Sequence, residues 1–176
     1  MASAVFPDNT VLINFACIDE LGLLEGWLRG RGRWTAAVHF EATRSASYYP
    51  PLNAAIAGSW LGEPIEVPDE GQVDRIRRNV FGGTAAEPLR HLGEAETCHL
   101  LMTDSQWHEA WWVSDDRDAL EYARRQSILT RETRDIVAEL VADGDLSAIS
   151  GFDLLRRMAA EGRGLRLPSG PGDLLS

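Results

Sequence analysis

The sequence predicts an α/β fold in which helices cover both faces of a central, mostly parallel sheet, giving three α/β/α layers. Three short apolar runs, Ala4–Phe6, Trp34–Val38 and Trp111–Val113, have the composition of strands. Longer segments with helical spacing of apolar residues separate these runs, and strands that alternate with helices usually form a parallel sheet. The 176 residues, of which 44% are hydrophobic, are enough for one domain with a sizeable core.

Capping and breaking residues place the helices between these strands. The first strand ends at Pro7, and Asp8 or Asn9 is expected near the N-cap of the next helix. A glycine-rich turn at 30–32 ends the second helix, and Pro50 stops the helix after the second strand. The predicted helices are Thr10–Ile18, Leu21–Trp27, His39–Tyr49, Leu52–Trp60, Asp69–Val80, Leu92–Met102, Asp116–Gln126, Arg131–Asp143 and Ala148–Glu161, with short extended pieces at Ile65–Val67 and Ser127–Leu129.

The element pattern suggests how the chain is organised. Residues 1–130 contain all the strand candidates and are expected to form the main domain. Residues 131–164 are expected to be a helical extension packed on that domain. The Gly/Pro-rich segment 165–176 is expected to be a loose tail.

Composition narrows the possible functions. The net charge is −10, with 27 acidic and 17 basic residues, so the chain is not a general polyanion binder. All the basic residues are arginines, and the absence of lysine excludes a P-loop and Schiff-base chemistry. Two cysteines predict no disulfide framework. Without a long apolar run or a signal peptide, the expected location is the cytoplasm, with no membrane partner.

Acidic residues follow each of the three predicted strands. They are Asp8 after the first, Glu41 after the second, and Asp115 and Asp116 after the third, with Glu94 and Glu96 near the start of a later helix. In an open parallel sheet, ligands bind at the carboxyl ends of the strands. We therefore expect these carboxylates to gather at one edge of the sheet.

Such a cluster needs protons or cations to persist. At about 5 Å separation and an effective dielectric of about 20, each pair of carboxylates costs roughly 3 kcal/mol. Ligands that are all oxygen favour Mg²⁺ or Mn²⁺ over Zn²⁺, and such ions activate water and bind phosphate. The pattern alone leaves open that these residues are ordinary exposed acids and helix caps.

At these same residues the sequence resembles the PIN-domain superfamily. The segment PDNTVLIN (residues 7–14) resembles the opening strand–Asp–helix motif, with Asn9 and Thr10 in swapped order. HFEA (39–42), LGEAE (92–96) and VSDD (113–116) resemble the next three acidic motifs, in the family's order. Asp116 takes the register of a Thr-x-Asp motif, with Ser114 in the Thr position.

The resemblance implies a metal-dependent endoribonuclease, commonly the toxin of a bacterial toxin–antitoxin pair. It implies catalytic roles for Asp8, Glu41, Glu94 and Asp116. Asp8, Glu94 and Asp116 are the expected ligands of Mg²⁺ or Mn²⁺, with Asp115 as a further one. Asn9, Ser114 and Glu96 are expected to orient the carboxylates by contacting them without binding the metal ion themselves. The implied partners are an RNA substrate, a cognate antitoxin protein and a second copy of the chain in a homodimer.

Arginines near the predicted site suggest where RNA would bind. Arg75, Arg78 and Arg90 are candidates for contacts with the RNA backbone. An alternative is that the arginines at 75–78 form a solvated helix face that pairs with neighbouring acids. Two other functions stay open: a PIN-like module that binds RNA or a partner without cutting it, and a metal-dependent phosphatase. The missing lysine and Asp-x-Asp motif count against the phosphatase.

Overall fold

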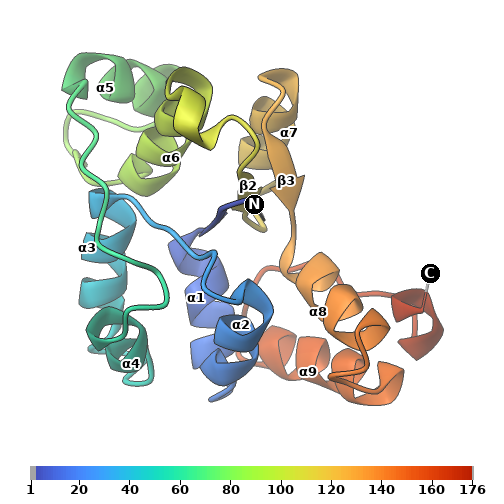
Figure 1. Ribbon diagram of the computed structural model, residues 1–176. Coiled ribbons are helices and arrows are strands. Elements are labelled where there is room, and N and C mark those ends of the chain that lie inside the picture. The colour runs from blue at the N-terminus through green and yellow to red at the C-terminus, as the bar shows by residue number, and fades with distance from the viewer. Residues whose placement is uncertain (1–2, 176) are drawn as a thin grey trace.

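The computed structural model describes residues 3–175 (Figure 1). Its strands are β1 (Val5–Pro7), β2 (Trp111–Val113) and β3 (Leu129–Arg131). Its α-helices are α1 (Asn9–Ala16), α2 (Leu21–Leu28), α3 (Ala36–Ser45), α4 (Leu52–Ala57), α5 (Glu70–Asn79), α6 (Leu92–Thr103), α7 (Arg117–Arg125), α8 (Thr133–Ala142) and α9 (Ala148–Ala160). Two 3₁₀ turns, η1 (Ser105–Trp107) and η2 (Pro171–Leu174), complete the elements.

The strands form a parallel sheet in the order β1-β2-β3, which confirms the predicted α/β class. Isolated parallel bridges continue the pairing beyond β1, joining Val5 to Gly32 and Thr35 to Ile65. The chain therefore leaves β1 toward residues 32–35 on one side and later returns to β2 on the other. This reversal makes the carboxyl end of β1 a topological switch point, the place where open α/β sheets form a crevice.

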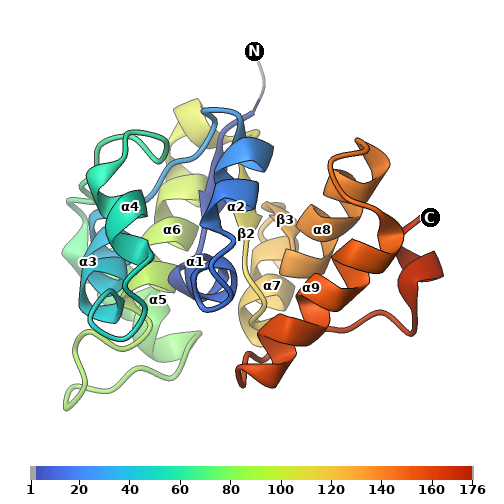
Figure 2. The same cartoon turned by 90° about the horizontal axis from the view of Figure 1, so that it is seen from below.

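Both faces of the sheet are buried, because side chains alternate between them. Val5 and Val113 belong to a core that includes α1, α2, α8 and α9. Phe6 and Trp112 belong to a second core with α6 and α7. In Figures 1 and 2, α1 and α2 lie between the α3–α4 pair and the α8–α9 pair. Helices on both faces explain why β1 is buried along its whole length, whereas the edge strand β3 leaves Leu129 exposed.

The prediction that Trp34–Val38 forms the second strand was wrong for most of this segment. Only single bridges form in this segment, and α3 begins at Ala36. The Thr35 hydroxyl caps the helix by accepting a hydrogen bond from the backbone N–H of Val38 at 3.4 Å. Two alanines in the first turn then favour helix over strand. Glu41 consequently lies in the middle of a helix and does not directly follow a strand.

The C-terminal helices belong to the main core. Arg131 ends β3, just past the predicted boundary at 130, and lies over the Trp111 ring at 3.7 Å. Ile136, Leu155 and Met158 are fully buried with α1 and α2 in the same core. The segment 165–176 was predicted to be a loose tail, but Leu174 is 1% exposed and packs on α8 and α9. No helix within residues 3–175 is long and apolar enough to cross a membrane.

Candidate functional site: an acidic cavity at the sheet edge

Asp8 occupies the switch point at the end of β1. Its backbone N–H donates to the Val113 carbonyl at 2.9 Å, which fixes it beside β2. Its side chain caps α1, accepting from the Asn9 N–H at 2.7 Å and from the Thr10 hydroxyl at 2.9 Å. The Ser114 hydroxyl lies 3.4 Å from the same carboxylate. The sequence therefore folds a buried carboxylate, 3% exposed, into the crevice.

Glu41 and Glu94 reach the same place from two packed helices, α3 and α6. The Glu41 carboxylate accepts a hydrogen bond from the Gly93 N–H at 3.1 Å. A Cβ at Gly93 would lie 3.0 Å from both Glu41 carboxylate oxygens and from a methyl carbon of Val38, so a larger residue would have to displace them. Glu94 is the next residue of α6 after Gly93, and His91 Nδ1 lies 3.2 Å from the Glu94 carboxylate. The Gly-Glu pair thus brings α3 and α6 carboxylates together.

These carboxylates perturb one another. Burial, followed by the charge of Glu94, raises the pKa of Asp8 from its usual 3.8 to about 7. Burial, followed by the charges of Asp8 and Glu94, raises the pKa of Glu41 from 4.5 to about 8. The charges of Asp8, Glu41 and Glu94 act on one another, so the three carboxylates lie near each other, although Glu41 and Glu94 come from helices and only Asp8 comes from the end of a strand. A cluster with such raised pKa values in a crevice is typical of a functional site.

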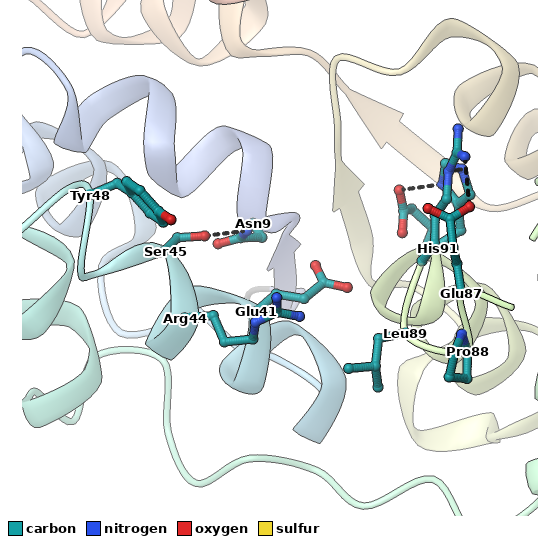
Figure 3. A pocket seen from close by; sticks show the side chains of 11 residues that line it. Asn9, Glu41, Arg44, Ser45, Tyr48, Glu87, Pro88, Leu89 and His91 are labelled. Atoms are coloured by element: carbon teal, nitrogen blue, oxygen red, sulfur yellow. Dashed lines mark hydrogen bonds and ion pairs between the residues drawn. The ribbon is translucent and has the colours of Figure 1, made fainter.

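The three carboxylates line or adjoin a cavity of about 640 Å³, here called the acidic cavity. One wall, here called the α3 wall, is the end of α3 with the turn after it: Glu41, Arg44 and Ser45 come from the helix and Tyr48 from the turn, with Asn9 beside them. The other wall is the 87–91 segment and Glu94. Figure 3 shows Glu41 between these walls, with Ser45 and Tyr48 on one side and Leu89 and His91 on the other. Among residues 3–175, no arginine or histidine forms an ion pair with Asp8 or Glu41.

The donor atoms suit a hard cation but are not gathered around one point. Asn9 Nδ2 donates to Ser45 Oγ at 3.2 Å, whereas Asn9 Oδ1 is buried without any hydrogen-bond partner. A buried acceptor beside surplus negative charge is suited to a cation or a donor that completes it. As the side chains lie, residues 3–175 contain no group of three or more His, Cys, Asp or Glu ready to hold a metal ion.

The structure separates Asp116 and Asp115 from the other predicted ligands. Asp116 is exposed and caps α7, accepting from the Ala119 N–H at 2.9 Å. It lines a second cavity of about 540 Å³, with Thr10 and Arg117. Ser114 links the two places, because its hydroxyl accepts from the Asp116 N–H at 3.2 Å and faces Asp8.

Asp115 has a structural role in this arrangement. Its carboxylate accepts hydrogen bonds from the Thr133 N–H at 3.0 Å, from the Thr133 hydroxyl and from Asn14 Nδ2 at 2.7 Å. Arg163 Nε donates to Asn14 Oδ1 at 2.8 Å. These contacts fasten the C-terminal helices to α1. Asp115 therefore faces Thr133 and Asn14, away from the Asp8–Glu41–Glu94 cluster.

The residues predicted to orient the carboxylates lie where they can do so. Glu96 accepts a hydrogen bond from the Ala37 N–H at 2.9 Å and so holds the start of α3, the helix that carries Glu41, against α6. Asn9 and Ser114 contact the acidic cavity and Asp8, respectively. These three residues support the cluster through the elements that carry it.

The predicted RNA-binding arginines fall into two groups. Arg90 lines the acidic cavity and pairs with Glu87 at 3.1 Å. Arg78 pairs with Asp74 at 2.7 Å on α5, and Arg75 is exposed on the same helix. Neither Arg75 nor Arg78 lines the acidic cavity. The alternative of a helix face paired with neighbouring acids therefore describes Arg78 better.

Sequence reasoning missed the α3 wall of the cavity. Arg44 and Ser45 follow Glu41 at three and four residues, the spacing of one helix face, and Tyr48 joins them from the turn after the helix. That spacing was visible in the sequence and would have identified them once Glu41 was placed inside a helix. His91, which faces Glu94, was three residues before a predicted ligand and could have been found in the same way.

The fold and the site together define an α/β protein with a buried acidic cluster at the switch point of its parallel sheet. Comparisons with protein-family models, with curated proteins and with solved structures found no match to the chain.

Raising the pH should destabilise the metal-free protein. The folded state keeps protons on Asp8 up to a pKa of about 7 and on Glu41 up to about 8, whereas the unfolded chain releases them near 3.8 and 4.5. The contribution of these two carboxyls to the free energy of unfolding is fully present below about pH 4 and is lost as the pH rises through 7 to 8. Each carboxyl contributes at most roughly 5 kcal/mol. Urea unfolding in chelator should give a lower free energy at pH 8 than at pH 5.

The variant Glu41→Gln provides the control for this pH dependence. It removes one titrating carboxyl, so its unfolding free energy should change less between pH 5 and pH 8. An equal pH dependence in the variant and the wild type would show that Glu41 does not titrate as described.

Proposed function

We propose that this chain is a divalent-metal-dependent ribonuclease of the PIN-like kind, centred on Asp8, Glu41 and Glu94. The observation that carries the proposal is the convergence of these carboxylates at the sheet's switch point, without an ion-pairing cation for Asp8 or Glu41 in residues 3–175. Structural acids usually lie on the surface or pair with arginine. A buried, unpaired cluster is costly and indicates a functional role.

Mg²⁺ or Mn²⁺ fits the chemistry of the donor atoms. Asp8 and Glu94 would hold the ion, and the unpartnered Asn9 Oδ1 offers a further oxygen. When bound, such an ion supplies Lewis-acid activation of the phosphate and of water. Glu94 faces His91 through Oε1 and Asp116 caps α7 through Oδ1, so the second oxygen of each carboxylate would be the one to join them. Because the carboxyls hold protons, metal binding should strengthen as the pH rises from 6 to 8.

Glu41 is placed to move a proton during hydrolysis. One of its oxygens accepts from Gly93, and the other has no hydrogen-bond partner within residues 3–175. With a pKa of about 8 in the metal-free protein, Glu41 holds its own proton at neutral pH, and it would accept a proton from attacking water once a bound cation or a higher pH has removed that proton. Attack by water on phosphorus leaves a 5′-phosphate and a 3′-hydroxyl on the products. Arg44 and Arg90, which line the cavity, would balance phosphate charge.

Removing the metal provides the test of this function. Single-stranded RNA incubated with the protein and Mn²⁺ should be cleaved to products with 5′-phosphate ends. Chelator should abolish cleavage, and added Mn²⁺ should restore it. Calorimetric titration of Mn²⁺ at pH 6 and pH 8 gives a readout that does not depend on activity. Cleavage that persists in chelator would contradict the mechanism.

A second function is favoured by the placement of Asp115 and Asp116. Both predicted ligands make structural hydrogen bonds, and a PIN-like module with a weakened centre could bind RNA or a protein partner without cutting. The same assay separates the two functions. RNA binding without cleavage in Mn²⁺ would favour the binding module, including the setting in which a partner protein covers the acidic cavity.

A further inference from the structure

The second half of α3 and the turn that follows it border the acidic cavity. Glu41, Arg44 and Ser45 line the cavity from the helix and Tyr48 lines it from the turn, whereas Ala37 and Val38 in the first turn of the helix are buried. Figure 3 shows Tyr48 beyond Ser45, at the end of this wall away from Glu41. Tyr48 lies in the turn that follows α3, three residues after Ser45, and lines the same cavity as Glu41 and Arg44.

Arg44 is the uncommitted cation of the cavity. Within residues 3–175 its guanidinium forms no hydrogen bond or ion pair and only lies 5.9 Å from the Phe40 ring. Arg90 on the opposite wall is already paired with Glu87. An arginine left unpaired on the same helix face as Glu41 is available for a ligand's anionic group. Its planar guanidinium suits the oxygens of a phosphate.

Exposed apolar side chains surround this cation. Tyr48 is 83% exposed, Phe40 is 46% exposed, and Leu89 on the facing wall is 43% exposed. Exposed rings beside a free arginine form a surface on which an unpaired base can stack while its phosphate is bound. A duplex offers no free base face, and a chain with net charge −10 is poorly suited to track a duplex backbone.

We propose that the α3 wall is a subsite for single-stranded RNA, in which Tyr48 stacks on a base and Arg44 binds the phosphate between that base and the acidic cluster. This subsite rests on the proposed nuclease function, and it implies that the substrate of the nuclease is single-stranded RNA. Tyr48 and Arg44 bind and position the strand. The cluster of Asp8, Glu41 and Glu94 carries out the chemistry.

Binding can be measured separately from cleavage in the Asp8→Asn background with Mn²⁺, by fluorescence anisotropy of a labelled ten-nucleotide RNA. Adding Tyr48→Ala should weaken binding about 10-fold, and Tyr48→Phe should restore it, because stacking requires the ring and not the hydroxyl. Adding Arg44→Gln should weaken binding and reduce the slope of log Kd against log salt by about 0.7, the value for one phosphate contact on a single strand. A duplex of the same sequence should bind weakly and without dependence on Tyr48.

Arg156→Gln is the matched control. Arg156 lies on α9, far from the cavity, and its guanidinium is also 5.9 Å from a phenylalanine ring, that of Phe152. This substitution should leave both affinity and salt slope unchanged. If the wild type cleaves RNA but the Tyr48 and Arg44 variants bind RNA as well as their parent does, the proposed subsite would be wrong and the proposed nuclease function would stand. If RNA binding depends on both residues but the wild type does not cleave RNA, the proposed nuclease function would be wrong and the RNA-binding subsite would stand. Equal affinity for duplex, or no RNA binding, would overturn the subsite.

Discussion

Asp8→Asn should lower the rate of Mn²⁺-dependent RNA cleavage about 1000-fold and, at pH 8 without metal, raise the melting temperature. The loss of activity follows because Asp8 is the most buried carboxylate of the cluster and is fixed by three neighbouring donors. Stabilisation of transition-state charge by a metal is worth several kcal/mol, and each 1.36 kcal/mol changes the rate tenfold. A neutral amide cannot replace the negative ligand.

The gain in stability has the same cause as the raised pKa. At pH 8 the Asp8 carboxylate is buried, charged and repelled by Glu94, so removing its charge relieves the folded state. Each kcal/mol gained should raise the melting temperature by about 2–4 °C. At pH 5 the wild-type carboxyl is already protonated, and the difference should largely disappear. Scanning calorimetry at the two pH values in chelator measures both effects.

Asp153→Asn is the control for the charge change. Asp153 is exposed on α9, and the substitution removes the same charge far from the cavity. It should change neither cleavage nor the melting temperature appreciably. If Asp8→Asn destabilised the metal-free protein at pH 8, the charged carboxylate would stabilise the fold as the N-cap of α1. The proposal that its charge is repelled by the neighbouring carboxylates would then be wrong.

The carboxylate cluster was predictable because it depends on features that the sequence displays directly. Apolar runs marked β1 and β2, and parallel strands bring the residues that follow them to one edge. Asp8 and Glu94 came from that argument together with the helix-start pattern at Gly93. Glu41 was identified for a reason that was partly wrong, since it was expected soon after a strand and lies in the middle of α3. It still reaches the cluster because α3 packs on α6.

Competition between hydrogen-bond partners was not predictable. Asp115 and Asp116 are adjacent, and pattern alone does not show that Thr133, in a distant helix, engages the first while α7 uses the second as a cap. The C-terminal segment shows the same limit. Its Gly/Pro content suggested looseness, yet one side chain, Leu174, fills a space between α8 and α9. Long-range packing of single residues leaves little trace in local composition.

Arg77→Met should reduce the free energy of unfolding by about 3 kcal/mol, the largest loss expected from any single arginine. The sequence grouped Arg77 with exposed neighbours, but its side chain is 2% exposed. It donates to Asp74 at 2.7 Å and to the carbonyl oxygens of Thr84 and Glu87 at 3.1 Å each. A hydrogen bond from a charged donor is worth about 1.5–3 kcal/mol, and methionine replaces none of them. Urea unfolding at pH 7 measures the loss.

Arg78→Met separates burial from charge, because Arg78 pairs with the same Asp74 at 2.7 Å while its side chain is 48% exposed. An exposed pair contributes at most about 1 kcal/mol, so this neighbour should cost far less. Arg77→Lys should fall between the two, since an ammonium lacks the fork that bonds Asp74 and the loop together. The loop that Arg77 holds leads into the 87–91 wall of the acidic cavity, so Arg77→Met should also raise the KM for RNA. Equal losses from the two methionine variants would show that Arg77 does not organise this wall.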